Sequence, residues 1–123
     1  MAIAAGNVIS AADVLAALVT VDTQTTFTTT TPAGDGWWRW VGPFVEFYYA
    51  SSASLTSGTS FTSAVILPAG ARPLQMNPAA ASGGVAKDRE ANGAINTDGT
   101  FTVRNNYSGS TTVSLYALFI PAV

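Results

Sequence analysis

The chain has 123 residues, of which 48% are hydrophobic and only 10% are charged, with a net charge of −2 and no histidine or cysteine. This length suits one domain with a sizeable core, and the lack of cysteine excludes disulfides and thiolate metal sites. The slight negative charge argues against nucleic-acid binding, which needs a basic surface.

Residues 1–19 form the first apolar segment. Ser10 suits the N-cap of a helix over 11–18, and Asp13 would favour the positive end of its dipole. A helix of about two turns is marginal alone, so we expect it to need a packing partner. The segment lacks the basic start of a secretory signal, and no apolar run reaches the length of about 18 residues that a membrane helix needs. We therefore expect no membrane insertion.

Threonine dominates residues 20–31, and consecutive β-branched residues favour extended chain. Because both faces of such a strand are polar, its register is weakly specified. The sequence Pro-Ala-Gly-Asp-Gly at 32–36 then predicts a break. We place a domain boundary there, which divides the chain into an N-terminal segment, 1–33, and a β-domain, 34–123.

The second part predicts short strands separated by turn signals. We expect strands over 37–41, 44–49, 61–67, 87–90 and 113–120, loops over 78–84 and 105–110, and a loop or weak edge strand over 51–60. The last strand is apolar on both faces, which predicts a central strand or a subunit interface. Turn signals every eight to twelve residues or so predict a small antiparallel β-sandwich or jelly roll.

Two motifs stand out within this domain. Val65–Pro73 reads VILPAGARP, in which Pro68 and Gly70 end an apolar strand. Ala94–Val103 contains Asp-Gly between two alternating apolar runs, a strong hairpin signal. The Asn-x-Asp-Gly sequence at 96–99 is also a partial calcium loop, but most ligands are missing, so a hairpin turn is favoured.

A Leu-Pro-Ala-Gly-x-Arg-Pro corner followed by an Ile-x-x-Asp-Gly-Thr hairpin resembles the C-terminal β-domains of bacteriophage tail fibres and receptor-binding proteins, over about residues 34–123. The resemblance implies a homotrimeric knob in the virion, with an N-terminal segment that attaches to other virion proteins. The position before Arg72, often aromatic in that family, is Ala71 here.

Catalysis has little support in the sequence. Without histidine or cysteine, the commonest general base and the thiol nucleophile are missing. A glycosidase would need two carboxylates across a sugar, whereas the candidates lie at turns or in an alternating charge cluster: Asp35, Glu46, Asp88, Glu90 and Asp98. We expect no enzyme activity, no catalytic residue, no metal and no cofactor.

The best functional candidates are aromatic. Seven aromatic residues lie between positions 37 and 49, and strand alternation directs about half of them into the core. We expect Trp37 and Tyr48 to be partly exposed, and they are the candidates for stacking on a ligand, the alternative being a purely structural role. Arg72 is either a corner residue that bonds carbonyls or salt-bridges, which is favoured, or a ligand contact.

These features support two functions. The first is a tail-fibre or tail-tip protein that contacts cell-wall carbohydrate on the host surface. The second is a capsid decoration or head-fibre protein with a structural role and no receptor. The two differ in whether the domain carries an exposed aromatic groove.

Overall fold

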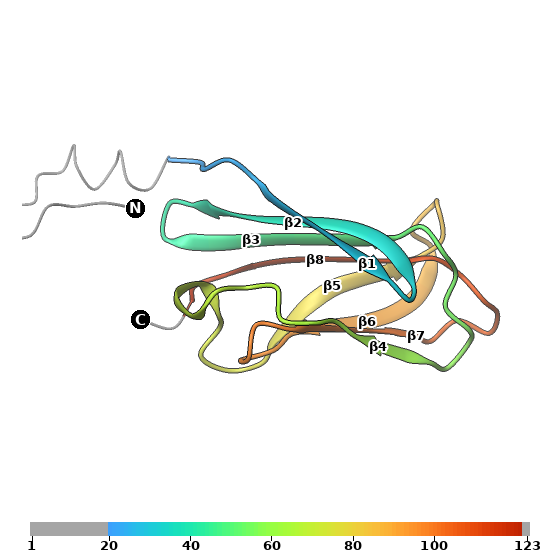
Figure 1. Ribbon diagram of the computed structural model, residues 1–123. Coiled ribbons are helices and arrows are strands. Elements are labelled where there is room, and N and C mark those ends of the chain that lie inside the picture. Colours follow the sequence, from blue (N-terminus) through green and yellow to red (C-terminus); the bar gives the residue numbers. More distant parts are fainter. Residues whose placement is uncertain (1–19, 122–123) are drawn as a thin grey trace, which may run out of the picture.

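The computed structural model describes residues 20–121, which form an all-β fold (Figure 1). The strands are β1 (Thr25–Thr30), β2 (Ala33–Val41), β3 (Phe44–Ser51), β4 (Ser60–Thr62), β5 (Asn77–Gly83), β6 (Arg89–Ile95), β7 (Phe101–Asn105) and β8 (Val113–Phe119). They form one antiparallel sheet in the order β1-β2-β3-β8-β5-β6-β7-β4, which confirms the predicted antiparallel all-β class. The helix expected over 11–18 lies outside the described residues.

The sheet curls so that β1, β2 and β3 lie over β6, β7 and β4 (Figure 1), and a core of aromatic rings fills the space between. Phe101 on β7 is fully buried, with its ring centroid 4.6 Å from that of Tyr49 and 5.3 Å from that of Phe47, both on β3. The rings of Phe27 on β1 and Phe61 on β4 lie 5.9 and 5.8 Å from Phe101. One continuous sheet thus encloses the core, where two separate sheets were expected.

The threonine-rich strand β1 belongs to this same sheet, so the domain boundary placed at 32–36 is wrong. β1 pairs with β2 along its whole length, and of the break predicted at 32–36 only Pro32 lies in the turn, while 33–36 belong to β2. The register is decided by Phe27, whose ring packs into the core opposite Gly36. A Cβ at Gly36 would overlap that ring. A single apolar residue therefore selects a register that the polar threonines leave open.

The structure confirms two predicted hairpins and the central position predicted for the last strand. β2 and β3 are joined by Gly42-Pro43, and β6 and β7 by a turn that contains Asp98-Gly99. Gly42 and Gly99 have φ of +57° and +85°, a region that glycine enters at little cost. β8 lies between β3 and β5, which confirms its central position.

The corner that follows β4 packs directly on the β6–β7 turn. The backbone amides of Ile66 and Leu67 both donate to the carbonyl of Gly99, at 2.9 and 3.1 Å. The chain then turns through a short 3₁₀ segment, η1 (Ala69–Ala71). Arg72 Nε donates to the Leu67 carbonyl at 2.9 Å and closes the corner. The two motifs that carry the resemblance therefore form one structural unit.

The strand predicted over 61–67 is shorter than expected. β4 ends at Thr62, but Ser63 still contacts β7: its amide donates to the Phe101 carbonyl at 2.9 Å, and its hydroxyl accepts a hydrogen bond from the Phe101 amide at 2.9 Å. The chain then leaves the ladder, so Val65 is 60% exposed while Leu67 is fully buried. A regular strand over 61–67 would place Phe61, Val65 and Leu67 on one face, and the structure does not keep them together.

The loop predicted over 78–84 is also wrong, since most of it belongs to β5. This strand pairs with β8 on one side and β6 on the other, and so connects the two halves of the sheet. Backbone pairing on both sides, which small side chains do not reveal, makes it a strand. The strand predicted over 87–90 begins only at Arg89, because Lys87 lies in the preceding turn with φ of +58°.

Candidate functional site

The outer face of β2, β3 and β8 carries the candidate site. The register places Trp37 beside Tyr48, and Tyr48 beside Tyr116. The rings of Trp37 and Tyr48 are partly exposed and stacked, with centroids 5.8 Å apart and planes inclined by 28°. Phe47 and Tyr49 lie on the opposite face and are buried. The structure thus brings the two predicted ligand-contacting aromatics together on the surface.

An open groove of about 250 Å³ lies beside this pair. Its lining comes from three strands: Thr26, Phe27 and Thr28 of β1, Asp35, Gly36 and Trp37 of β2, and Tyr48 of β3. The ring of Phe27 packs against the core, so the groove offers the rings of Trp37 and Tyr48, the hydroxyl groups of Thr26, Thr28 and Tyr48, and the carboxylate of Asp35. Apolar ring faces can stack on the C–H face of a sugar, while polar groups at the rim can bond its hydroxyls.

Two other hollows on the described surface are larger but lack this combination. One, of about 390 Å³, lies near Arg89 and Thr111, and the other, of about 370 Å³, lies over β6 and β7 near Asn92 and Arg104. Neither is lined by an aromatic residue. The groove at Trp37 is smaller, yet it alone among the three offers a stacking surface.

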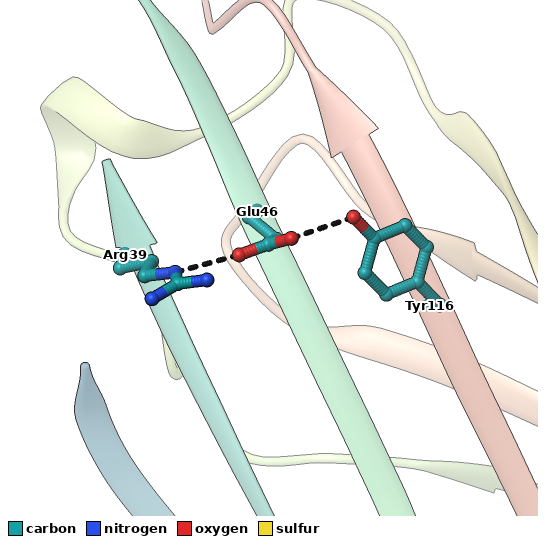
Figure 2. A network of polar contacts seen from close by, with 3 residues as sticks. All are labelled: Arg39, Glu46 and Tyr116. Atoms are coloured by element: carbon teal, nitrogen blue, oxygen red, sulfur yellow. Dashed lines mark hydrogen bonds and ion pairs between the residues drawn. The ribbon is translucent and has the colours of Figure 1, made fainter. Parts of the chain in front are cut away.

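A polar network crosses β2, β3 and β8 next to the groove (Figure 2). Glu46 Oε1 accepts a hydrogen bond from Arg39 Nε at 2.6 Å, and Oε2 accepts one from the Tyr116 hydroxyl at 2.6 Å. The Arg39 guanidinium also lies 5.1 Å from the centre of the Trp37 ring, within cation–π distance. The network therefore helps to orient Trp37.

The hydrogen bonds of this network shift the pKa values of Glu46 and Tyr116. Partial burial raises the pKa of Glu46, but the hydrogen bonds from Tyr116 and Arg39 and the positive charge of Arg39 outweigh it, so the pKa is lowered. The hydrogen bond to Glu46, together with burial, raises the pKa of Tyr116. Glu46 therefore remains a carboxylate, and Tyr116 a phenol, across the neutral range.

The network predicts a pH-dependent contribution to stability. We expect Glu46→Gln to lower the free energy of unfolding by about 1 kcal/mol at neutral pH, because two charge-assisted hydrogen bonds are weakened at a partly exposed site. Since the pKa of Glu46 is lowered in the fold, this contribution is present above the ordinary glutamate pKa of about 4.3 and is lost as pH falls through the folded-state pKa. Urea unfolding across acid and neutral pH measures it.

The exposed Glu90 supplies the matched control. Glu90→Gln removes the same charge outside the network and should change stability by less than about 0.5 kcal/mol. A Glu46→Gln deficit that stayed constant down to about pH 2 would contradict this account.

Arg72 lies away from the groove, at the corner between β4 and the β6–β7 turn. Its hydrogen bond to the Leu67 carbonyl fits the structural role that the sequence favoured. The neighbouring Ala71 is 1% exposed, so this position faces the core. Position 71, which is often aromatic in the tail-fibre family and is alanine here, therefore contributes to packing at the corner. A ligand contact by Arg72 remains a prediction.

The Asn-x-Asp-Gly sequence forms the hairpin turn. Asp98 Oδ1 accepts hydrogen bonds from the Thr100 hydroxyl at 2.6 Å and the Thr100 amide at 3.1 Å, which lower the pKa of Asp98. Asn96 donates to the Thr100 hydroxyl at 2.9 Å. Within residues 20–121, no group of three or more acidic side chains is arranged to hold a metal ion.

Several lining residues were missed by the sequence analysis. Asp35 lies two residues before Trp37 on one strand, so the period of two could have placed both on the same face. Thr26 and Thr28 enter the groove only through the β1–β2 register. No sequence pattern fixed that register, because the threonines of β1 are polar on both faces.

Comparison with known proteins found no matching family model, no similar curated protein and no similar solved structure. Across the described part of the chain, no helix is long and apolar enough to cross a membrane. The groove and its side chains are therefore the basis for a functional proposal.

Proposed function

We propose that this chain is a structural protein of a bacteriophage virion, a tail-fibre or tail-tip component that contacts carbohydrate of the host cell wall. The observation that carries the proposal is the stacked Trp37–Tyr48 pair beside a groove that also contains Asp35. Exposed aromatic pairs are enriched at binding sites, because they bury large areas with little loss of side-chain entropy.

The polar side of the groove supports binding without cleavage. Asp35 is the one carboxylate among the lining residues, whereas retaining and inverting glycosidases use two. Glu46, on the neighbouring strand β3, already accepts hydrogen bonds from Arg39 and Tyr116. A sugar stacked on Trp37 would therefore meet hydrogen-bonding groups but no acid–base pair.

The virion assignment rests on the resemblance of the corner and the hairpin. Contact between these motifs, through the Gly99 carbonyl and the Leu67 and Ile66 amides, gives their order and spacing a structural reason. The assignment includes attachment to other virion proteins through residues 1–19, which lie outside the described part of the chain.

We also propose that copies associate, and the resemblance implies a homotrimer. The outer face of β8 supports association, because Tyr116, Leu118 and Ile120, near its end, are 40%, 49% and 67% exposed. The low content of charged residues also favours association between copies. Size-exclusion chromatography with light scattering tests the proposal, and a monomer at micromolar concentration would reject it.

The carbohydrate site predicts the effect of two substitutions. Trp37→Ala and Tyr48→Ala should each weaken binding to host cell-wall glycan at least about tenfold, equivalent to about 1.4 kcal/mol, by removing half of the stacking surface. Both side chains are partly exposed, so the fold should persist. Glycan-array screening of the full chain, followed by calorimetry on the glycans that bind, measures the effect.

Tyr107→Ala is the matched control, because Tyr107 stacks on Arg89 and is not among the groove's lining residues. It should leave glycan affinity unchanged. Binding that survived Trp37→Ala and Tyr48→Ala would locate the ligand elsewhere. If no cell-wall glycan bound an intact, associated protein, the structural decoration or head-fibre role would replace the receptor-binding one.

A further inference from the structure

The charge of the groove narrows the class of sugar that it can take. Asp35 is exposed on the outer face of β2. No residue from 20 to 121 donates a hydrogen bond to its carboxylate or forms an ion pair with it. The flanking lining residues Thr26 and Thr28 are neutral. The groove therefore contains one uncompensated negative charge beside an aromatic pair.

Arg39 and Lys87 are each bound to a residue other than Asp35. The Cα atom of Arg39 is four residues along β2 from that of Asp35, about 13 Å at the usual rise per residue, and its guanidinium is paired with Glu46. Lys87 Nζ donates to Ser114 Oγ at 2.8 Å, and Ser114 lies two strands across from Asp35, about 10 Å. Neither cation forms an ion pair with Asp35.

We propose that this groove selects glycans with a free amino group over N-acetylated or acidic ones. A protonated amino sugar stacked on Trp37 can place its ammonium group near Asp35 and form a charge-assisted hydrogen bond. A neutral sugar keeps only the stacking and hydroxyl bonds, and a uronate or phosphate is repelled. This selectivity rests on the proposed carbohydrate site.

The test compares two tetramers of one sugar, glucosamine and N-acetylglucosamine, at about pH 6, below the pKa of ordinary amines. The full chain should prefer the glucosamine tetramer by about three- to fivefold at low salt, and added salt should reduce the preference. Asp35→Asn should abolish the preference while binding of the N-acetylated tetramer changes little. An oligogalacturonate tetramer should bind more weakly than either.

Glu90→Gln is the control, because it makes the same change in net charge at an exposed position outside the groove. It separates local recognition from general attraction between a cationic sugar and an acidic protein. Equal binding of the two tetramers, or equal loss of preference in Asp35→Asn and Glu90→Gln, would overturn the selectivity and leave the carbohydrate site standing. Failure of all tetramers and all arrayed glycans to bind would reject the proposed function itself.

Discussion

Replacing Phe101 with alanine is expected to destabilise the fold by about 3–5 kcal/mol, the usual range for a buried phenylalanine. Phe101 is fully buried, and its ring contacts four others: Phe27, Phe47, Tyr49 and Phe61. These rings come from β1, β3 and β4, so the cavity would loosen both edges of the curled sheet at once. Urea unfolding followed by tryptophan fluorescence measures the loss.

Two further variants keep this prediction testable if Phe101→Ala fails to fold. Phe101→Leu retains a buried apolar side chain and should lose about 1–2 kcal/mol. Val65→Ala, at a position that is 60% exposed, should change stability by less than about 0.5 kcal/mol. A Phe101→Leu variant as stable as the parent would show that the aromatic cluster is not the main core.

Gly99→Ala should lower the free energy of unfolding by roughly 3 kcal/mol, for two independent reasons. Gly99 has φ of +85°, where a side chain costs about 1–2 kcal/mol. A Cβ there would also lie 2.5 Å from the Leu67 carbonyl oxygen and 2.7 Å from Arg72 Nε. Overpacking of this kind costs about 1–3 kcal/mol. The substitution would force the corner away from the hairpin, and thermal or urea unfolding would report it.

Gly70→Ala is a matched control within the same corner. Gly70 is exposed, its φ lies outside the positive region, and a Cβ there would meet nothing within 4 Å. Its stability should stay within about 0.5 kcal/mol of the parent. Equal losses at Gly70 and Gly99 would mean that the contact between corner and hairpin contributes little.

Turn chemistry was the most reliable guide to the fold. Gly42-Pro43 and Asp98-Gly99 predicted both hairpins, because few residues accept the backbone angles of such tight turns. Small and polar segments were the least reliable. β5 was expected to be a loop, and β1 was assigned to another domain, because neither carries the alternating apolar pattern that marks a half-buried strand.

The candidate site was likewise predicted only in part from the sequence. Alternation along β2 and β3 predicted Trp37 and Tyr48 as the exposed aromatics, since neighbouring side chains on a strand point to opposite faces. It did not reveal that Thr26 and Thr28 line the same groove. Those contacts depend on the pairing of β1 with β2, which a threonine-rich strand does not specify.

The sequence by itself determined what is local in this protein: the all-β class, the two hairpins, the central last strand and the outward-facing aromatic pair. Backbone angles and the period of two act over a few residues, so they can be inferred without the fold. Only the tertiary structure decided which strands pair, where the sheet curls, and that Asp35 has no ion-pair partner among residues 20–121. Strand pairing and curl depend on contacts such as those of Phe27 with Phe47 and Phe101, residues that lie far apart in the chain.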